Sequence, residues 1–366
     1  ELVADSFSYD AASHRLYVKS SNAIAADQML EVSVRRQVLQ AENAVGLTIS
    51  GLDFAHANTS LSARWGAVKV SGRNNLLDDL VVSDMDAVCV QISGTDSALT
   101  NSVIQRCGQS GVSGSGTRLT IAGNRITYAN TRGFNKWWEA GGIKLIGEAG
   151  LHDSVIRENL VAYCQADGIW VDWKNTGNLI EGNTTAYNSG FGIQYEASQS
   201  GTIRGNVSYG NGLRGIYLLE SANSVVEGNA VFANSLEGIG IVDGSRSASD
   251  PTLRPVNNRV TGNSIAWNDF NRNWVQLVLP GPGYGNFSDG NSFKSEGILP
   301  RASLGFVAPG NPAYVSIASW RATLQLDTNS VEQAASMPAA LQSAIATRRL
   351  IGGVELPGFL SRPGTY

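Results

Sequence analysis

The chain of 366 residues is poor in charged side chains and has no long apolar run. Charged residues make up 16%, below the usual quarter. The net charge of −4 excludes a nucleic-acid partner that binds through a basic face. No apolar run approaches the roughly 18 residues of a membrane-spanning helix, so we expect no membrane partner. The composition does not indicate an oligomeric state.

Cysteine and histidine are also scarce, with three of each. Cys89, Cys107 and Cys164 are too few and too scattered for a disulfide framework or a zinc site, so we expect three small buried thiols and no metal. His152 has no serine placed as a partner, which excludes a Ser-His-Asp triad. The chain begins at Glu1 without a methionine, so we expect a processed product whose missing leader says nothing about export.

Glycine is abundant, with 41 residues, and it recurs in a Gly-Ile pair at a nearly constant interval. The successive intervals are 26, 24, 23 and 23 residues, for Gly142, Gly168, Gly192, Gly215 and Gly238. An asparagine column keeps step, comprising Asn159, Asn183, Asn206 and Asn229. A fixed period of this size predicts a solenoid, and we expect the asparagines to form an internal amide ladder at a turn.

Apolar residues alternate within each repeat and are followed by turn residues, which is the period of a strand. A coil of about 23 residues has room for three short strands. The sequence therefore predicts an all-β, single-stranded, right-handed parallel β-helix of about ten coils. We expect an N-terminal β lead-in cap over residues 1–40, the β-helix over 41–296 and a C-terminal capping segment over 297–366, with an amphipathic helix over 330–349 that closes the far end. Longer intervals place inserted loops at 131–141 and 243–255.

Two carboxylates fall at the same point of consecutive repeats. Asp172 lies four residues after Gly168, and Glu196 lies four residues after Gly192. Alternation turns both outward on neighbouring strands, with backbones roughly 4.8 Å apart. Like charges at this distance raise one pKa, so that one carboxyl group is protonated beside an ionised one. Such a pair suits an acid and a nucleophile, as in retaining glycosidases.

Outward residues around this pair would bind a sugar substrate through aromatic faces and polar groups. The expected binding residues share the exposed strip or the first inserted loop, and they are Lys144, Trp170, Trp138, Glu139, Gln194, Tyr217 and Trp173. Trp137 lies in the same loop. Glu220 is expected at the rim and Asp167 in a turn.

The motif from Gly141 to Glu196 resembles the active-site segment of β-helical glycoside hydrolases, those of family 120 (β-xylosidases) and family 141. It comprises Gly-Gly-Ile-Lys-Leu at 141–145, Gly-Ile-Trp-Val-Asp-Trp at 168–173 and Tyr-Glu at 195–196. The resemblance implies that Asp172 is the nucleophile and Glu196 the acid/base. It also implies a secreted or periplasmic protein that acts on a carbohydrate without an organic cofactor.

Three functions are consistent with these patterns. The first is a retaining glycoside hydrolase. The second is a polysaccharide lyase or uronate epimerase, with Lys144 as a base and Asp172 and Glu196 as ligands of calcium. Arg132, Lys136, Arg157 and Lys174 would supply positive charge in that case. The third is a non-catalytic glycan-binding β-helix, since a fold does not settle a function.

Overall fold

The computed structural model describes residues 6–22, 32–59, 65–147, 150–298, 300–304 and 314–352. The chain divides into two units, residues 1–34 and 35–366. In the first unit, β1 (Ser6–Asp10) and β2 (Arg15–Lys19) pair as an antiparallel hairpin. The capping role of residues 1–40 stays a prediction.

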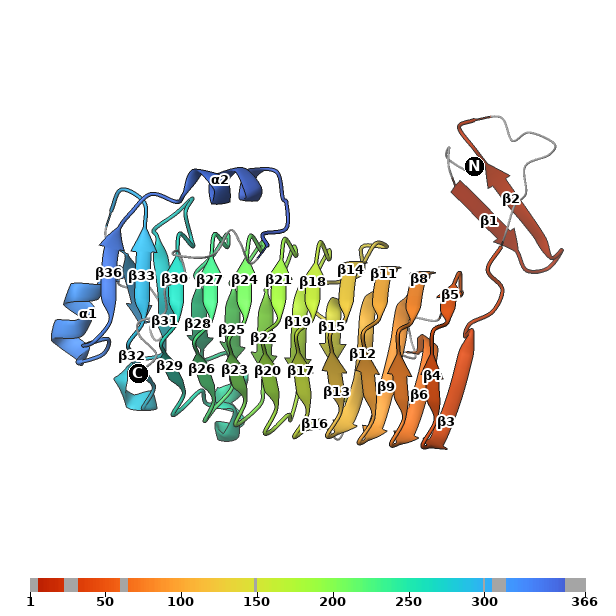
Figure 1. The fold of residues 1–366 in the computed structure, drawn as a ribbon, viewed down its shortest axis with the longest axis horizontal. Helices are drawn as coiled ribbons and strands as arrows, with labels where there is room; N and C mark the ends of the chain where they lie inside the picture. The colour runs from red at the N-terminus through yellow and green to blue at the C-terminus, as the bar shows by residue number, and fades with distance from the viewer. Residues whose placement is uncertain are drawn as a thin grey trace. The chain divides into compact units, whose positions relative to one another are not determined.

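The second unit is the predicted parallel β-helix, built from three long parallel sheets (Figure 1). We call the sheet that carries the candidate site the site sheet. Its parallel strands are β3 (Leu39–Val45), β6 (Gly66–Arg73), β9 (Val88–Thr95), β12 (Ser110–Thr117), β15 (Gly141–Leu145), β19 (Asp167–Asp172), β22 (Ile193–Glu196), β25 (Ile216–Leu219), β28 (Ile239–Val242), β31 (Val275–Leu279) and β34 (Arg301–Leu304). At its end β35 (Tyr314–Ser316) pairs antiparallel with β34, and the short β16 (Leu151–His152) pairs with β12.

The other two sheets continue each coil in turn. The second sheet contains β4 (Thr48–Ser50), β7 (Leu76–Asp78), β10 (Ala98–Thr100), β13 (Thr120–Ala122), β17 (Val155–Arg157), β20 (Leu179–Glu181), β23 (Thr202–Arg204), β26 (Val225–Glu227), β29 (Arg259–Thr261) and β32 (Phe287–Asp289). The third contains β5 (Asp53–Ala55), β8 (Val81–Met85), β11 (Val103–Cys107), β14 (Arg125–Ala129), β18 (Leu160–Ala162), β21 (Thr184–Ala186), β24 (Val207–Tyr209), β27 (Ala230–Phe232), β30 (Ser264–Ala266), β33 (Ser292–Ser295) and β36 (Val331–Ala334).

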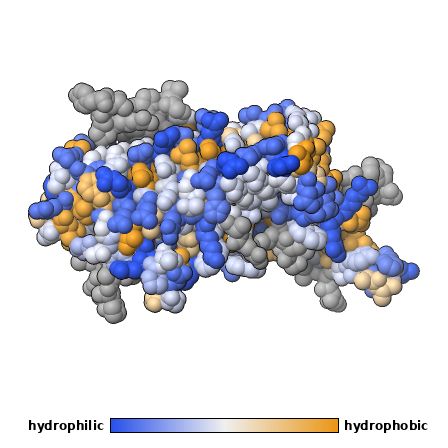
Figure 2. Space-filling view, turned by 90° about the horizontal axis from the view of Figure 1, so that it is seen from below, coloured by the Kyte–Doolittle hydropathy of each residue, from blue (hydrophilic) through white to orange (hydrophobic). Residues whose placement is uncertain are grey.

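The core follows the predicted alternation along the site sheet. Ile143, Val171 and Tyr195 point inward and are fully buried, and they belong to one continuous apolar cluster along the β-helix. Outside the core, Figure 2 shows hydrophilic residues over much of one face, interrupted by smaller hydrophobic groups. Among the described residues, no helix is long and apolar enough to cross a membrane.

The asparagine column forms the predicted ladder. Each side-chain amide donates to the carbonyl oxygen of the next asparagine at 2.9–3.0 Å, from Asn124 through Asn159, Asn183, Asn206, Asn229 and Asn263 to Asn291. A second ladder, which the sequence analysis missed, joins Asn188, Asn211, Asn234 and Asn268. These asparagines lie in the turns that precede the site strands. Because each buried amide must bond to the amide of the next coil, the ladder keeps the site strands in register.

The C-terminal region differs from the expectation of a single helix over 330–349. Its first part is strand β36, which extends the third sheet, and only Ala339–Ala346 is helical (α2). Helix α1 (Ile317–Leu324) inserts Trp320 into the core at the end of the stack, whereas α2 runs along its flank (Figure 1). There the Tyr187 hydroxyl donates to the Ala344 carbonyl at 3.0 Å. Parallel pairing also continues past residue 296, through β34 and β36.

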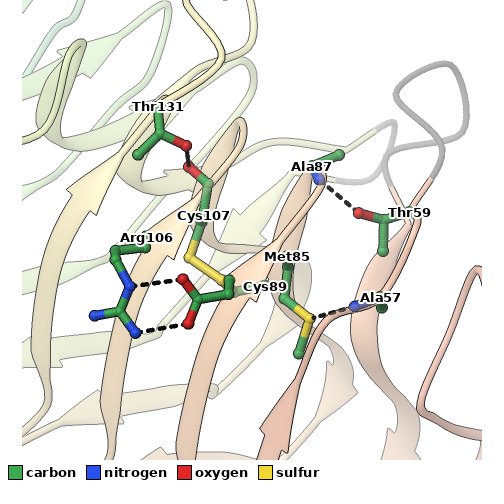
Figure 3. The surroundings of a disulfide bond; sticks show 9 residues. Ala57, Thr59, Met85, Ala87, Cys89, Arg106, Cys107 and Thr131 are labelled. Carbon is green, nitrogen blue, oxygen red and sulfur yellow. Dashed lines mark hydrogen bonds and ion pairs between the residues drawn. A yellow bond between two sulfur atoms is a disulfide. The ribbon is translucent and has the colours of Figure 1, made fainter. Parts of the chain in front are cut away.

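The expectation of three buried thiols is wrong for two of the cysteines. Cys89 and Cys107 form a disulfide between the site sheet and the third sheet, with Cα atoms 5.6 Å apart (Figure 3). Cys164 is free and buried, as expected. The two cysteines are only 18 residues apart, which is less than one repeat, so the repeat period does not predict that they pair. The bond forms because adjacent strands of one coil turn both side chains into the core.

Candidate functional site

The two candidate carboxylates lie on adjacent strands in the predicted register. Asp172 ends β19 and Glu196 ends β22, and their Cα atoms are direct partners in the site sheet. In the same pair of strands Val171 and Tyr195 are buried in the core, so the carboxyl groups face outward. Their side chains are nevertheless only 13% and 10% exposed, because neighbouring side chains cover them.

Lys144 forms the floor of the site. It lies on β15 directly beside Trp170 of β19, and its ammonium group contacts the indole face. Lys144 Nζ donates to Asp172 Oδ2 at 2.7 Å. Burial lowers the pKa of Lys144 to about 8, and the opposing charges of Asp172 and Glu196 limit that fall. The ion pair holds one carboxylate oxygen of Asp172 in place beside a cation.

Glu196 is held by three donors. Trp170 Nε1 and Gln194 Nε2 both donate to Oε2, at 3.1 and 2.6 Å. Arg246 Nη2 donates to the other oxygen, Oε1, at 2.6 Å. Burial raises the pKa of Glu196, and the charge of Asp172 raises it further, while Arg246 opposes both. A raised pKa is what an acid working near neutral pH needs.

Arg246 is a site residue that the repeat could not indicate. It begins η1 (Arg246–Ala248), in the inserted loop that also holds η2 (Pro251–Leu253). Its guanidinium bridges Glu196 and Glu220, and its backbone N–H donates to Glu220 Oε1 at 2.8 Å. The expectation that Glu220 lies at the rim is wrong, since it is 1% exposed. A buried carboxylate requires a partner, and Arg246 supplies it.

Five of the remaining expected binding residues fall into two groups, and the sixth, Glu139, is buried in the first inserted loop at 6% exposure. Gln194, Trp170 and Tyr217 lie side by side in the site sheet and are almost fully buried. By contrast, Trp138 in the inserted loop is 65% exposed and Trp173 is 36% exposed. Among the described residues, no hydrogen bond joins either of these two indoles to the carboxylates.

Tyr217 belongs to an apolar wall beside Glu196. Its ring centroid lies 4.5 Å from that of Phe191, and burial raises the pKa of its hydroxyl to about 12. A phenol with this pKa stays protonated and can donate a hydrogen bond to a ligand. The exposed Trp137 ring meets Phe191 edge-on, which connects the first inserted loop to this wall.

Asp167 also differs from expectation. It is the first residue of β19 rather than a turn residue, and it is 3% exposed. Its Oδ1 accepts from the Phe191 N–H at 2.7 Å. Burial raises its pKa to about 7. We interpret Asp167 as a residue that positions the strand before Glu196.

The described part of the chain contains no group of three or more His, Cys, Asp or Glu side chains arranged to hold a metal ion. The charges of the site form a linked array instead, in which the two cations Lys144 and Arg246 are shared among the carboxylates Asp172, Glu196 and Glu220. Fully ionised, this array carries one net negative charge. It can transfer a proton and present a carboxylate, but it offers no uncompensated cation.

Comparison with known proteins agrees with the fold. A family model described as right handed beta helix region matches residues 134–279, which include both carboxylates. A search of curated proteins finds no match. Among solved structures, the A-module of the mannuronan C-5 epimerase AlgE4 from Azotobacter vinelandii superposes with a TM-score of 0.51 at 14% identity, over 68% of this chain and 68% of that one.

Two other structures are similar to the same degree. The A-module of the epimerase AlgE6 from Azotobacter vinelandii gives a TM-score of 0.51 at 16% identity, over 71% of this chain and 79% of that one. XylC, solved in complex with xylose, gives 0.51 at 15% identity, over 68% of this chain and 50% of its own length. At such identities the likeness shows a shared fold, and the chemistry must be argued from the site.

Proposed function

We propose that this protein is a glycoside hydrolase that acts with retention, with Asp172 as nucleophile and Glu196 as acid and base. The observation that supports this most is the direct pairing of the two carboxylates on adjacent strands, each bound to a different cation. Side chains that extend from paired strands roughly 4.8 Å apart can bring their carboxyl groups to the short separation used by retaining enzymes, about 5–5.5 Å.

The reaction takes two steps. In the first, Asp172 attacks the anomeric carbon while Glu196 gives its proton to the departing glycosidic oxygen, which leaves a glycosyl ester on Asp172. In the second, Glu196, now a carboxylate, takes a proton from a water molecule as that water attacks the same carbon and releases Asp172. Lys144 stabilises Asp172 each time it carries negative charge.

Arg246 connects this cycle to substrate binding. Glu196 Oε2 accepts two hydrogen bonds, so the proton to be donated belongs on Oε1, where Arg246 now lies. The Arg246 side chain is 38% exposed, and it contacts Glu196 through Nη2 and Glu220 through Nε, so Nη2 can leave Glu196 while the ion pair with Glu220 is kept. We expect a leaving group that enters beside Tyr217 to displace it, which removes the charge that lowers the pKa of Glu196.

The alternative of a lyase or epimerase has one observation in its favour. The pKa of Lys144, about 8, would suit a base that abstracts a proton next to a carboxylate. However, Lys144 is bound to Asp172 at 2.7 Å, and the array around it is net negative. A uronate would bring another negative charge to an array that is already net negative. The charge balance therefore favours a neutral glycan.

The family resemblance and the neighbouring structures support the same general conclusion. The motif at 141–196 is similar to that of β-helical glycoside hydrolases, and XylC was solved with a sugar. We propose a secreted or periplasmic location. The Cys89–Cys107 disulfide supports it, because such bonds persist in oxidising compartments.

A panel of p-nitrophenyl glycosides and neutral polysaccharides tests the proposal. We expect turnover of at least one of them, and a fall in kcat/KM of about 1,000-fold or more in both Asp172→Asn and Glu196→Gln. Glu196→Gln should keep the melting temperature of the native protein to within a few degrees. Asp172→Asn leaves the buried Lys144 without its ion-pair partner, so it should be less stable, and circular dichroism confirms that it is folded. Undiminished turnover in either variant would contradict the assignment, and binding without any turnover would favour the glycan-binding function.

A further inference from the structure

A small polar recess lies next to Lys144, on the side of the site away from Glu196. It has a volume of about 50 Å³, and the strands β9, β12 and β15 contribute most of its lining. The lining is rich in hydroxyl and amide groups, and it includes Val88, Gln109, Ser113, Glu139, Lys144 and Ile146.

Two polar groups of the recess are buried and lack a protein partner. Gln109 is 5% exposed and Ser113 is 9% exposed. Gln109 Oε1 and Ser113 Oγ make no hydrogen bond, although each is shielded from bulk solvent. A buried polar atom left unpaired destabilises the fold, so such atoms in a native protein indicate a ligand or bound water. The two groups lie on one short stretch, before and within β12.

The recess adjoins the nucleophile in the register of the sheet. Ser113 is the direct Cα partner of Lys144, and Lys144 is the partner of Trp170 on the strand that ends in Asp172. The recess therefore begins at Lys144, one strand from Asp172, and Ser113 lies one strand farther, about two strand spacings or roughly 10 Å from the strand of the nucleophile. Because Asp172 attacks from this side and Glu196 protonates the leaving group on the other, the recess serves the sugar unit that forms the covalent ester.

We propose that the recess binds the exocyclic hydroxymethyl group of a hexose, and that the enzyme prefers hexosides to the matching pentosides. This inference rests on the proposed hydrolase function. The hydroxyl of that group can donate to Gln109 Oε1 and accept from Ser113 Oγ, while its methylene contacts Val88 and Ile146. The volume is sufficient for a few water molecules or such a substituent.

Charge excludes two other occupants. A free cation would meet the ammonium group of Lys144, which lines the recess. A uronate carboxylate would meet the acceptor oxygen of Gln109 and the carboxyl group of Glu139, and the ammonium group of Lys144 is already paired with Asp172. A neutral group that both donates and accepts hydrogen bonds fits best.

The test uses matched sets of p-nitrophenyl glycosides that differ only at this position: a hexoside with its hydroxymethyl group, the pentoside that lacks it, and the hexuronide that carries a carboxylate. Gluco and galacto series of both anomers are compared. We expect kcat/KM for the hexoside to exceed that for the pentoside about 10- to 100-fold, with the hexuronide lowest. In Ser113→Ala this hexoside-to-pentoside ratio should fall about 5- to 10-fold.

Two further variants separate binding from folding. Ser113→Val fills the recess and should reverse the preference toward the pentoside, while Thr117→Ala, on the same strand outside the recess, should leave the ratio unchanged. Melting temperatures confirm that each variant is folded. Turnover with no preference for the hexoside would contradict the proposed role of the recess, and so would a ratio that Ser113→Ala leaves unchanged. Neither result would contradict the proposed hydrolase function.

Failure of the hydrolase itself gives a different result, namely no turnover of any glycoside by folded protein. The recess is then tested directly by NMR titration of the native protein with methyl glucoside and methyl xyloside. Tighter binding of the glucoside, lost in Ser113→Ala, supports the recess. Equal binding of both sugars, or binding of neither, contradicts it.

Discussion

Replacement of Lys144 by methionine isolates the ion pair on which the proposed nucleophile depends. Lys144 is 2% exposed and contacts Asp172 at 2.7 Å, so K144M leaves a nearly buried carboxylate without its partner. Removing one member of a buried pair costs about 3–5 kcal/mol of unfolding free energy. Because the Asp172 side chain keeps 13% exposure, we expect the lower end, about 3 kcal/mol.

The double variant K144M/D172N supplies the control. It removes both charges, and a buried pair can be replaced by neutral groups at little cost, so we expect it to lie within about 1 kcal/mol of the native protein.

Urea unfolding followed by circular dichroism measures the effect. With a slope of about 3 kcal/mol per molar urea, the midpoint of K144M should fall by about 1 M. A midpoint within 0.3 M or so of the native value would refute the reasoning. So would a double variant that is less stable than K144M, because the cost would then come from lost packing rather than from an unpaired charge.

Three further changes probe other parts of the account. Arg246 lowers the pKa of Glu196, so R246A should raise that pKa and keep the acid protonated at higher pH. The alkaline limb of the kcat/KM profile should then move to higher pH. The side chain of Asn206 bonds to Asn183, Asn229 and the Ile180 carbonyl, so N206A should lower stability by about 3–6 kcal/mol in urea unfolding. Loss of the disulfide in C89A/C107A should lower stability by about 3 kcal/mol with turnover intact.

Each of these three predictions has a result that would contradict it. For R246A the contradictory result is an alkaline limb that stays in place or moves to lower pH. Asn135 is exposed and outside the ladder, so N135A should change stability by less than about 1 kcal/mol, and an equal loss in both variants would argue against the ladder. Reductant should destabilise the native protein but not C89A/C107A, and equal sensitivity would contradict the role of the disulfide.

The sequence allowed the coil register to be predicted because every repeat places the same residue type at the same point. The interval between Gly168 and Gly192 was sufficient to place Asp172 beside Glu196, and the structure has this pairing. The same reasoning placed Lys144, Trp170 and Gln194 in one row. Regular stacking turns a distance along the chain into a distance in space.

Residues outside the repeat could not be placed in this way. Arg246 reaches Glu196 from a loop 50 residues later, and the path of a loop has no period. Glu220 was misplaced because its burial depends on Arg246. The sequence predicts a helix over Val331–Ala334 because a short apolar run fits both the helical and the strand period. The segment forms a strand instead because it pairs with the edge of β33.

Identification of the nucleophile tests the central claim most directly. The protein is incubated with an activated 2-deoxy-2-fluoro glycoside of the sugar that it hydrolyses, which slows the second step and lets the covalent ester accumulate. Peptide mass spectrometry then locates the label. The account predicts one sugar per chain, attached to Asp172 and absent from D172N. A label on Glu196, or turnover that inverts the anomeric carbon without any adduct, would contradict it.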